Sequence, residues 1–240
     1  MQEIISTLTS RERLHRRGIC VIVPTYNNET TIRDVVERCK EQSDDVIVVN
    51  DGCTDSTASI LAAIEGITIV TLSHNSGKGA ALKMGFRKAL EMGYSYAITL
   101  DADGQHLVSD TIKMSELVEK EDKFVLGTRL FNTKETPLRN KTGNRITSRV
   151  FKRLYGVYLK DTQTGLRAIP NRLIDFMLNV SGDHFEYEMN VLIDLVKNGE
   201  KIIEEDIKTV YLENSNKKSN FKVIKDSYKI YKNMFKRRNN

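Results

Sequence analysis

Short apolar runs alternate with helix-like segments along the first third of the chain. Apolar runs at 19–23, 46–49 and 67–72 are each stopped by turn residues, and apolar side chains recur at helical spacing over 32–39 and 54–64. Parallel strands are joined by crossovers of about a dozen residues or more, usually a helix, and such crossovers are right-handed. The sequence therefore predicts a parallel sheet whose first three strands end at one edge.

Two carboxylates follow the next strand-like run, at 94–100. Asp101 and Asp103 stand directly after this run, and the break at Gly104 allows both to turn toward one cation, with Gln105 nearby. In open α/β sheets, ligands bind beyond the carboxyl ends of the strands, and oxygen ligands suit Mg²⁺ or Mn²⁺. Because an isolated Asp-x-Asp is more often a solvated turn, the surrounding motifs must decide between the two interpretations.

A connection that contains two glycines, at 74–81, precedes the next helix. Lys78 places a cation near the helix N-terminus, where an anion is favoured, and Gly77 and Gly79 permit a close backbone approach. The spacing is not that of a Walker phosphate loop, and the glycines fit tight helix packing equally well. Asp51, after the second strand, is expected at the same edge as Lys78 and the two aspartates.

The composition is that of a globular protein in a reducing compartment. Of 240 residues, 40% are hydrophobic and 29% are charged, and the net charge is +5. The three cysteines suggest neither a paired metal site nor a disulfide framework. No apolar run approaches the roughly 20 residues that span a bilayer, and residues 1–17 are too polar for a secretory signal. The positive charge suits phosphate-bearing substrates or an anionic membrane, and no nucleic-acid-binding module is recognisable, so nucleic acid is not expected as a partner.

Several further motifs occur in a fixed order along the chain. They are Val23-Pro24-Thr25-Tyr26-Asn27, Val49-Asn50-Asp51-Gly52-Cys53-Thr54-Asp55, Asn75-x-Gly77-Lys78-Gly79-x-Ala81, Asp101-Ala102-Asp103-Gly104-Gln105-His106, Gly127-Thr128-Arg129, Gly143-Asn144-Arg145, Asp161-x-x-x-Gly165-Leu166-Arg167-Ala168 and Phe185-Glu186-Tyr187-Glu188. In order and spacing they resemble the inverting family 2 glycosyltransferases of GT-A fold. They are most similar to the polyprenyl-phosphate mannosyltransferase branch, the dolichyl-phosphate mannose synthases. This resemblance implies an α/β, Rossmann-like fold of the nucleotide-diphospho-sugar transferase type, with a mostly parallel central sheet flanked by helices.

The resemblance also implies a donor site and a metal site. The residues that would contact the nucleotide sugar are Pro24, Tyr26, Asn27, Glu29, Asp51, Gly52, Lys78, Asp101, Ala102 and Asp103. Asp101, Asp103 and Gln105 would hold Mg²⁺ or Mn²⁺ on the donor diphosphate. A bound cation stabilises the negative charge that develops on a nucleoside diphosphate as its bond to the sugar breaks.

The second half of the chain supplies cations. A strand at 123–127 is expected to bring Arg129 to the site edge, and the segment 131–153 is expected to be loop-rich and basic. Arg129, Arg139 and Arg167 are the candidates to clamp a phosphate, because a guanidinium group pairs bidentately with phosphate oxygens. A solvated basic face is the alternative interpretation.

Asp161 is the candidate base or acceptor-orienting carboxylate, with Glu186 and Glu188 behind it. An acceptor that is itself a phosphate monoester needs no strong base, because its second pKa of about 6 leaves it mostly ionised at neutral pH. The alternative is that these carboxylates cap helices or pair with the neighbouring arginines.

The chain is expected to end in a basic amphipathic tail, residues 213–240. Aromatic and aliphatic residues between Phe221 and Phe235 recur at helical spacing with lysines beside them. Such a stripe fits an anionic membrane interface, and it fits a helix packed on the protein body equally well. The predicted organisation is an N-terminal extension 1–17, a GT-A domain 18–212 with a nucleotide-sugar half 18–105 and an acceptor half 106–212, and the tail.

These features together predict the transfer of a hexosyl unit, mannose or glucose, from a GDP- or UDP-linked sugar to a polyprenyl phosphate with inversion. The enzyme would be cytoplasmic and peripheral at the inner face of the membrane, a placement compatible with a membrane-protein partner. Three alternatives stay open: a family 2 transferase acting on a cell-surface polysaccharide or other glycan, a nucleotidyltransferase, and a non-catalytic adaptor at the membrane surface.

Overall fold

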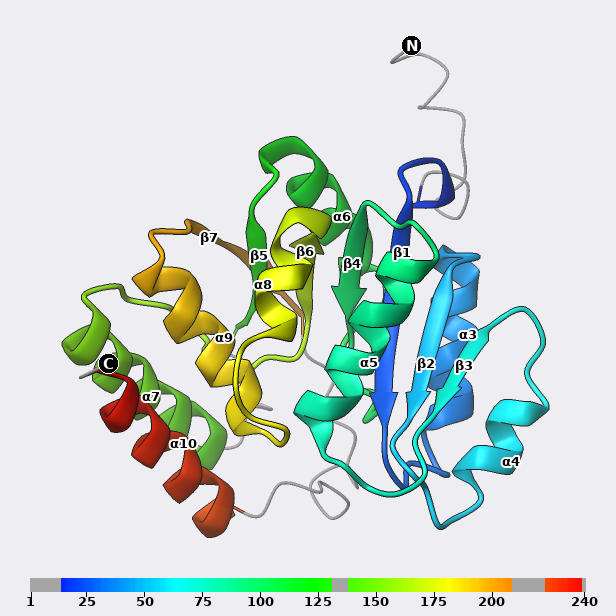
Figure 1. Cartoon of the computed structure of the whole chain (residues 1–240), viewed down its shortest axis with the longest axis horizontal. Coiled ribbons are helices and arrows are strands. Elements are labelled where there is room, and N and C mark those ends of the chain that lie inside the picture. Colours follow the sequence, from blue (N-terminus) through cyan, green and yellow to red (C-terminus); the bar gives the residue numbers. More distant parts are fainter. Residues whose placement is uncertain (1–13, 131–137, 209–222, 239–240) are drawn as a thin grey trace.

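The computed structural model describes residues 14–130, 138–208 and 223–238 and shows a seven-stranded sheet between two layers of helices (Figure 1). The strand order is β3-β2-β1-β4-β6-β5-β7. The strands are β1 (Ile19–Thr25), β2 (Val46–Asn50), β3 (Thr68–Thr71), β4 (Tyr96–Thr99), β5 (Phe124–Arg129), β6 (Arg167–Pro170) and β7 (Ile202–Ile207).

The first half of the sheet is parallel, as the alternating pattern predicts. β1 pairs with β2 and β4, and β2 pairs with β3, all in parallel. The crossovers contain α3 (Ile32–Gln42), α4 (Thr57–Ala62) and α5 (Lys78–Glu91). The arrowheads of β1, β2 and β4 therefore point to one edge (Figure 1), which confirms the α/β fold class.

The second half of the sheet contains an antiparallel strand that the sequence analysis did not anticipate. β6 lies between β4 and β5 and runs antiparallel to both, while β5 and β7 are parallel. The motif around Arg167, expected to present a phosphate-binding side chain, is this strand. The remaining helices are α6 (Asp110–Glu121), α7 (Leu138–Tyr155), η1 (Asn171–Leu173), α8 (Ile174–Leu178), α9 (Glu186–Lys197) and α10 (Val223–Arg238).

Alternating side chains of the strands belong to two separate hydrophobic cores, one on each face of the sheet. On β1, Cys20 and Ile22 belong to the core under α5, α8 and α9, whereas Ile19, Val21 and Val23 belong to the core under α3, α4 and α6. A strand that is buried on both faces reads as a continuous apolar run because its side chains point to opposite faces. The end of the N-terminal extension joins the second core, where Leu14 is buried.

The segment expected to be loop-rich, 131–153, is a helix from Leu138 onward, which corrects that prediction. Residues 131–137 lie outside the described part of the chain. The first half of this helix carries a polar buried face, with Asn144, Thr147 and Ser148 buried, and among its described side chains apolar packing begins only at Val150 and Phe151. Asn144 Nδ2 donates to the carbonyl of Lys160 at 2.7 Å, so hydrogen bonding replaces the apolar stripe by which amphipathic helices are recognised.

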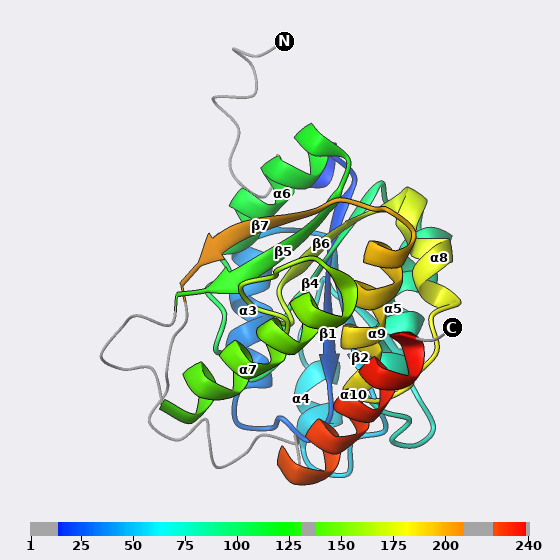
Figure 2. The same cartoon turned by 90° about the vertical axis from the view of Figure 1, so that its left-hand side faces the viewer.

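The tail forms α10, which lies beside α7 and α9 (Figure 2). Ile230 and Met234 are buried in the core, and the hydroxyl groups of Tyr231 and Thr147 lie 2.9 Å apart. Tyr228 and Phe235, on the outer side, are 66% and 55% exposed. The helix thus packs on the body with one face and exposes aromatic rings on another. None of the helices in the described ranges is long and apolar enough to cross a membrane.

Candidate active site

Asp51 lies at the carboxyl edge of β2 and binds the connection that leads into α5. Its carboxylate accepts the backbone N–H groups of Ser76 at 2.7 Å and Gly77 at 2.9 Å, and the side chain is buried. Burial raises the pKa of the Asp51 carboxyl, although the two N–H donors favour its ionised form. Asp51 therefore fixes the loop that carries Lys78.

The two glycines of this connection serve packing, which settles the alternative that the sequence left open. A Cβ atom on Gly77 would collide with His184 and the carbonyl of Asp183, and one on Gly79 would collide with Tyr187. The N–H of Ala80 donates to the carbonyl of Asp183 at 3.0 Å. The first turn of α5 is thus held against the segment before α9, and these glycines do not form an open phosphate cradle.

Lys78 is the ionic centre of the site. Its Nζ lies 2.7 Å from Oδ1 of Asp101 and 2.7 Å from Oε2 of Glu188, and its side chain is only 16% exposed. The two carboxylates raise the pKa of Lys78 against the opposing effect of burial. In turn, the Lys78 ammonium and His106 hold the pKa of Asp101 well below its usual range against the effect of burial. The side chain of Asp101 is therefore a carboxylate paired with an internal cation.

Asp101 also has a fixed steric environment. The backbone of Gly165 packs directly against its carboxylate, where a Cβ atom would collide with both oxygens. Nε2 of His106 lies 3.6 Å from Oδ2 of Asp101. On the strand before it, the hydroxyl of Thr99 donates to the carbonyl of Gly165 at 2.7 Å. Asp101, after β4, thus lies close to the segment that leads into β6.

Asp103, together with Asp101, suits a divalent cation. Its Oδ1 accepts the backbone N–H of Gln105 at 3.0 Å, while burial and the neighbouring negative charge of Asp101 raise its pKa. A divalent cation between the two carboxylates would relieve this repulsion, and carboxylate and amide oxygens are its preferred ligands. The residues present therefore fit Mg²⁺ or Mn²⁺. Within the described ranges no group of three or more His, Cys, Asp or Glu side chains forms a complete metal cage, so a substrate diphosphate and water would have to complete the coordination.

The other residues expected at the donor lie around the same edge. Pro24 is buried at the end of β1, Tyr26 is half-buried just beyond it, and Ala102 is buried. The Ala102 carbonyl accepts the hydroxyl of Thr31 at 2.7 Å, which ties the aspartate loop to the start of α3. Gly52 has φ of +64° and packs against the backbone of His74, so only glycine fits there.

Asn27 and Glu29 join the loop after β1 to the loop after β2. Oδ1 of Asn27 accepts the N–H of Thr54 at 2.8 Å, and Oε2 of Glu29 accepts the N–H of Ser56 at 3.2 Å. The two loops therefore form one wall of the site. Asn27 and Glu29 stabilise this wall through hydrogen bonds between the loops.

Arg129 and Asp161 form the main ion pair of the acceptor side. Nε of Arg129 lies 2.6 Å from Oδ2 of Asp161, and Nη2 lies 3.0 Å from Oδ1. Asp161 is fully buried, and its oxygens also accept the N–H groups of Arg129 and Gln163. A carboxylate engaged in this way orients Arg129, which agrees with the alternative of pairing with a neighbouring arginine; a role of Asp161 as a base or as an acceptor-orienting carboxylate stays a prediction.

Arg167 has an internal role in place of the expected phosphate clamp. It is only 3% exposed, its Nε donates to the carbonyl of Thr164 at 3.1 Å, and its Nη1 donates to the carbonyl of Glu188 at 3.0 Å. The guanidinium therefore joins β6 to the first turn of α9. Arg139 lies in the first turn of α7, and its side chain falls outside the described residues.

The contacts of Glu188 differ from those that the sequence predicts. Glu188 was placed behind Asp161, whereas the structure places it on Lys78, in the first turn of α9 and 9% exposed. No local pattern could reveal this contact, because it joins two helices that are far apart in the sequence.

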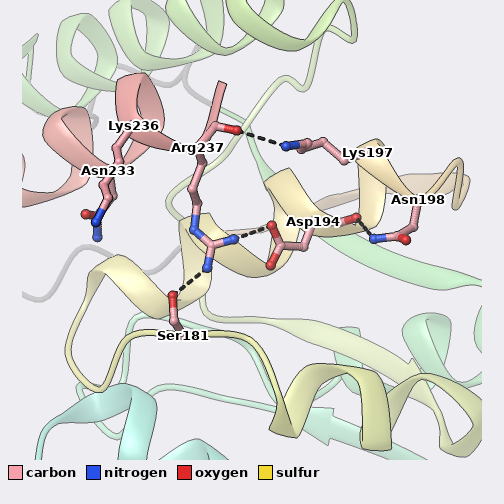
Figure 3. A pocket seen from close by; sticks show the side chains of 7 residues that line it. All are labelled: Ser181, Asp194, Lys197, Asn198, Asn233, Lys236 and Arg237. Carbon is pink, nitrogen blue, oxygen red and sulfur yellow. Dashed lines mark hydrogen bonds and ion pairs between the residues drawn. The ribbon is translucent and has the colours of Figure 1, made fainter. Parts of the chain in front are cut away.

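A hollow away from this edge lies between α9 and α10 (Figure 3). Its lining residues are Ser181, Asp194, Lys197, Asn198, Asn233, Lys236 and Arg237. The guanidinium of Arg237 binds the Asp194 carboxylate and also the Ser181 hydroxyl, the latter at 2.6 Å, and Nζ of Lys197 donates to the Arg237 carbonyl at 2.9 Å. Its cations are thus largely used to attach α10 to the body.

The fold and the edge define the class of this protein. A mostly parallel sheet with one antiparallel strand, and with an Asp-x-Asp pair at the carboxyl edge beside a basic acceptor half, is the GT-A glycosyltransferase fold. The chain belongs to glycosyltransferase family 2: the family described as "Glycosyl transferase family 2" matches residues 20–179.

Named relatives share this family but differ in the sugar. The chain is 33% identical to the UDP-N-acetylglucosamine–dolichyl-phosphate N-acetylglucosaminyltransferase of Methanococcus voltae, over 82% of this chain and 87% of that protein. It is 25% identical to the polyprenol monophosphomannose synthase of Mycolicibacterium smegmatis, over 77% and 74%. The mannosyl branch suggested by the motifs is therefore not singled out.

Solved structures support the fold. Glucosyl-3-phosphoglycerate synthase from Mycobacterium tuberculosis, in complex with Mn²⁺, UDP-glucose and phosphoglyceric acid, superimposes with a TM-score of 0.71 at 16% identity. The match covers 96% of this chain and 83% of that one.

Proposed function

We propose that this chain transfers a hexosyl unit from a nucleotide sugar to a polyprenyl phosphate with inversion, assisted by Mg²⁺ or Mn²⁺. The hexosyl unit is mannose, glucose or the N-acetylglucosamine named in the relative from M. voltae. The observation that carries the proposal is the ionic edge of a family 2 glycosyltransferase, where Lys78 pairs with Asp101 and Asp103 follows two residues later. The names of the relatives support the lipid phosphate acceptor.

The donor side follows from the parallel half of the sheet. We assign the nucleoside to the wall formed by Tyr26, Asn27 and Asp51, and the diphosphate to Asp101, Asp103 and Gln105. A divalent cation held by the last three residues would supply positive charge for the leaving diphosphate. The backbone of Gly165 lies close to the Asp101 carboxylate, so the reacting groups meet a preorganised edge.

The acceptor side needs charge compensation more than it needs a base. A phosphate monoester with a second pKa of about 6 is already nucleophilic at neutral pH, which agrees with the engagement of Asp161 by Arg129. We assign Arg129 to the acceptor phosphate, with Asp161 as the residue that positions it. Arg139, in the first turn of α7, is the proposed second cation.

A polyprenyl phosphate acceptor lies in a membrane, so the enzyme would have to bind at the membrane surface. On α10, the exposed rings of Tyr228 and Phe235 lie beside the exposed basic side chains of Lys232, Lys236 and Arg238. Aromatic rings bordered by cations bind an anionic interface through apolar burial and electrostatic attraction. We propose that this face of α10 brings the enzyme to the inner face of the membrane from the cytoplasm.

A transfer assay tests the proposal. The purified protein is incubated with Mn²⁺, a polyprenyl phosphate and radiolabelled UDP- or GDP-linked mannose, glucose or N-acetylglucosamine, and the product is extracted into organic solvent. We expect one sugar to enter the lipid phase with release of nucleoside diphosphate, and Asp101→Asn to abolish the transfer. Label that enters only a polysaccharide, or release of pyrophosphate, would contradict the proposal.

A further inference from the structure

Lys78 lies between two carboxylates at equal distance. Its Nζ is 2.7 Å from Asp101, at the end of β4, and 2.7 Å from Glu188, in the first turn of α9. The contact therefore joins the donor half of the chain to the acceptor half through a single ammonium group. One of its two partners, Asp101, is also a proposed ligand of a divalent cation. The Lys78 ammonium and that metal ion would therefore compete for the same carboxylate.

The two carboxylates differ in their freedom and their surroundings. Asp101 has the backbone of Gly165 close on one side and the ring of His106 3.6 Å from Oδ2, so little space surrounds its carboxylate. Glu188 stands at the N-terminus of α9, where the helix dipole stabilises negative charge. Nη2 of Arg167 lies 3.8 Å from Oε1 of Glu188, and this buried nitrogen has no hydrogen-bond partner among the residues that the structure describes. Glu188 is thus a carboxylate that can keep a cation at all times.

The mobile member of this group is Lys78. A lysine carries a compact charge on a flexible stem of four carbons, so its ammonium group can shift toward Glu188 without a change in the backbone. Such a shift leaves Oδ1 of Asp101 available to another cation. Without Glu188, the Lys78 ammonium would keep Asp101 as its carboxylate partner among the residues that the structure describes, and it would compete with the divalent cation for that carboxylate.

We infer that Lys78 is an exchangeable internal counter-ion: it neutralises Asp101 before a divalent cation arrives, and Glu188 retains it once that cation binds. The inference rests on the proposed function, because it presumes the metal role of Asp101 and Asp103. It assigns to Glu188 a positioning role that acts through Lys78, without contact between Glu188 and the metal or the donor.

Binding of Mn²⁺ alone tests this role without any reaction. Free Mn²⁺ is measured by electron paramagnetic resonance while the full-length protein is titrated. We expect Glu188→Gln to weaken Mn²⁺ binding by about tenfold, the effect of one close charge pair. Glu186→Gln is the matched control, because it removes the same charge from the same helical turn, and Glu186 contacts the backbone N–H of His184 at 3.4 Å. Its Mn²⁺ affinity should equal that of the unaltered protein.

A double substitution separates exchange from simple loss of a ligand. In Lys78→Met/Glu188→Gln the competing ammonium is gone, so Mn²⁺ affinity should return at least to that of the unaltered protein. Such recovery is strong non-additivity between two contacting residues. In turnover assays, Glu188→Gln should raise the Mn²⁺ concentration needed for half-maximal rate and leave kcat at saturating Mn²⁺ within about twofold, whereas general disruption of the site would lower kcat as well.

The outcomes distinguish this inference from the proposed function. If the unaltered protein binds Mn²⁺ and Glu188→Gln binds it equally well, the exchange is refuted and the proposed function stands. Further weakening in the double variant, with circular dichroism and thermal unfolding showing a folded protein, refutes it as well. A protein that binds no Mn²⁺ under any condition would overturn the metal assignment and this inference together.

Discussion

The backbone of Gly165 lies directly against the carboxylate of Asp101. The two residues belong to different halves of the sheet, which meet because β6 pairs antiparallel with β4. Because Gly165 has no side chain, the Asp101 carboxylate has room to lie against its backbone. Gly165 has no left-handed backbone conformation, so its requirement for glycine is steric.

Gly165→Ala should therefore damage the site more than the fold. The added methyl group would displace the Asp101 carboxylate, and we expect loss of Mn²⁺ binding and of most turnover, measured by metal titration and by the transfer assay. Gly143→Ala in α7 is the control, because no described residue lies within 4 Å of its Cβ position. That variant should keep full activity and gain about 0.5–1 kcal/mol of stability. Full activity in Gly165→Ala would refute the steric argument.

The two aspartates should affect stability with opposite sign in the absence of metal. The pKa of Asp103 is raised by burial and by Asp101, so its ionised form costs stability above that pKa. Asp103→Asn should therefore raise Tm near pH 7 in EDTA. As the pH falls through the raised pKa toward the unfolded value of about 3.9, Asp103 becomes protonated and the difference should vanish.

Asp101→Asn should instead lower Tm near pH 7. The pKa of Asp101 is held down chiefly by Lys78, against burial, so its charge contributes stability above the unfolded pKa of about 3.9, and that stability is lost as the pH falls. Thermal unfolding of both variants from pH 3 to 8 checks the pair. If both substitutions changed Tm in the same direction at neutral pH, the ion pair between Asp101 and Lys78 would not determine the stability of this site.

Asp161→Ala should strongly destabilise the protein, because it removes the fully buried carboxylate that binds the Arg129 guanidinium through two oxygens. Breaking a buried ion pair from one side costs about 3–5 kcal/mol, measurable by urea unfolding. Asp34→Ala is the control: its pair with Arg38 is exposed on α3, and such pairs contribute up to about 1 kcal/mol. In the milder Asp161→Asn we expect a raised KM for polyprenyl phosphate with measurable kcat. Complete loss of turnover in a folded Asp161→Asn protein would instead favour Asp161 as a base.

Membrane binding should depend on the outer rings of α10. The double variant Tyr228→Ser/Phe235→Ser should reduce binding to anionic vesicles by at least about tenfold, since burying one such side chain contributes about 1.5 kcal/mol or more. Sedimentation with vesicles at low and high salt measures it. Ile69→Ser, at an exposed apolar position on β3, should leave binding unchanged. Deletion of the whole tail is a poor test, because α10 also buries Ile230 and Met234 in the core. Unchanged sedimentation of the double variant would remove the membrane role of α10.

Predictions that rest on local pattern agree with the structure. The apolar run of β1 and the spacing of Ile32, Val35, Val36 and Cys39 on α3 were sufficient to place these elements, and both are buried as expected. Prediction from pattern was wrong for α7, whose buried face carries Asn144, Thr147 and Ser148. Among the described side chains of α7, the apolar residues that pack on the core begin only at Val150, so its first half, held by hydrogen bonds, lacks the apolar periodicity on which such predictions rely.

The sequence by itself determined the parallel half of the sheet and the edge at which Asp51, Lys78, Asp101 and Asp103 meet. These features follow from where each strand stops, and strand ends are encoded by neighbouring residues. Only the tertiary structure decided what each charge binds. It placed Glu188 on Lys78, Arg129 on Asp161, and Arg167 inside the protein. Ion pairs between distant segments depend on packing and burial, because a charge withdrawn from water requires a partner, and the chain order does not specify which partner that is.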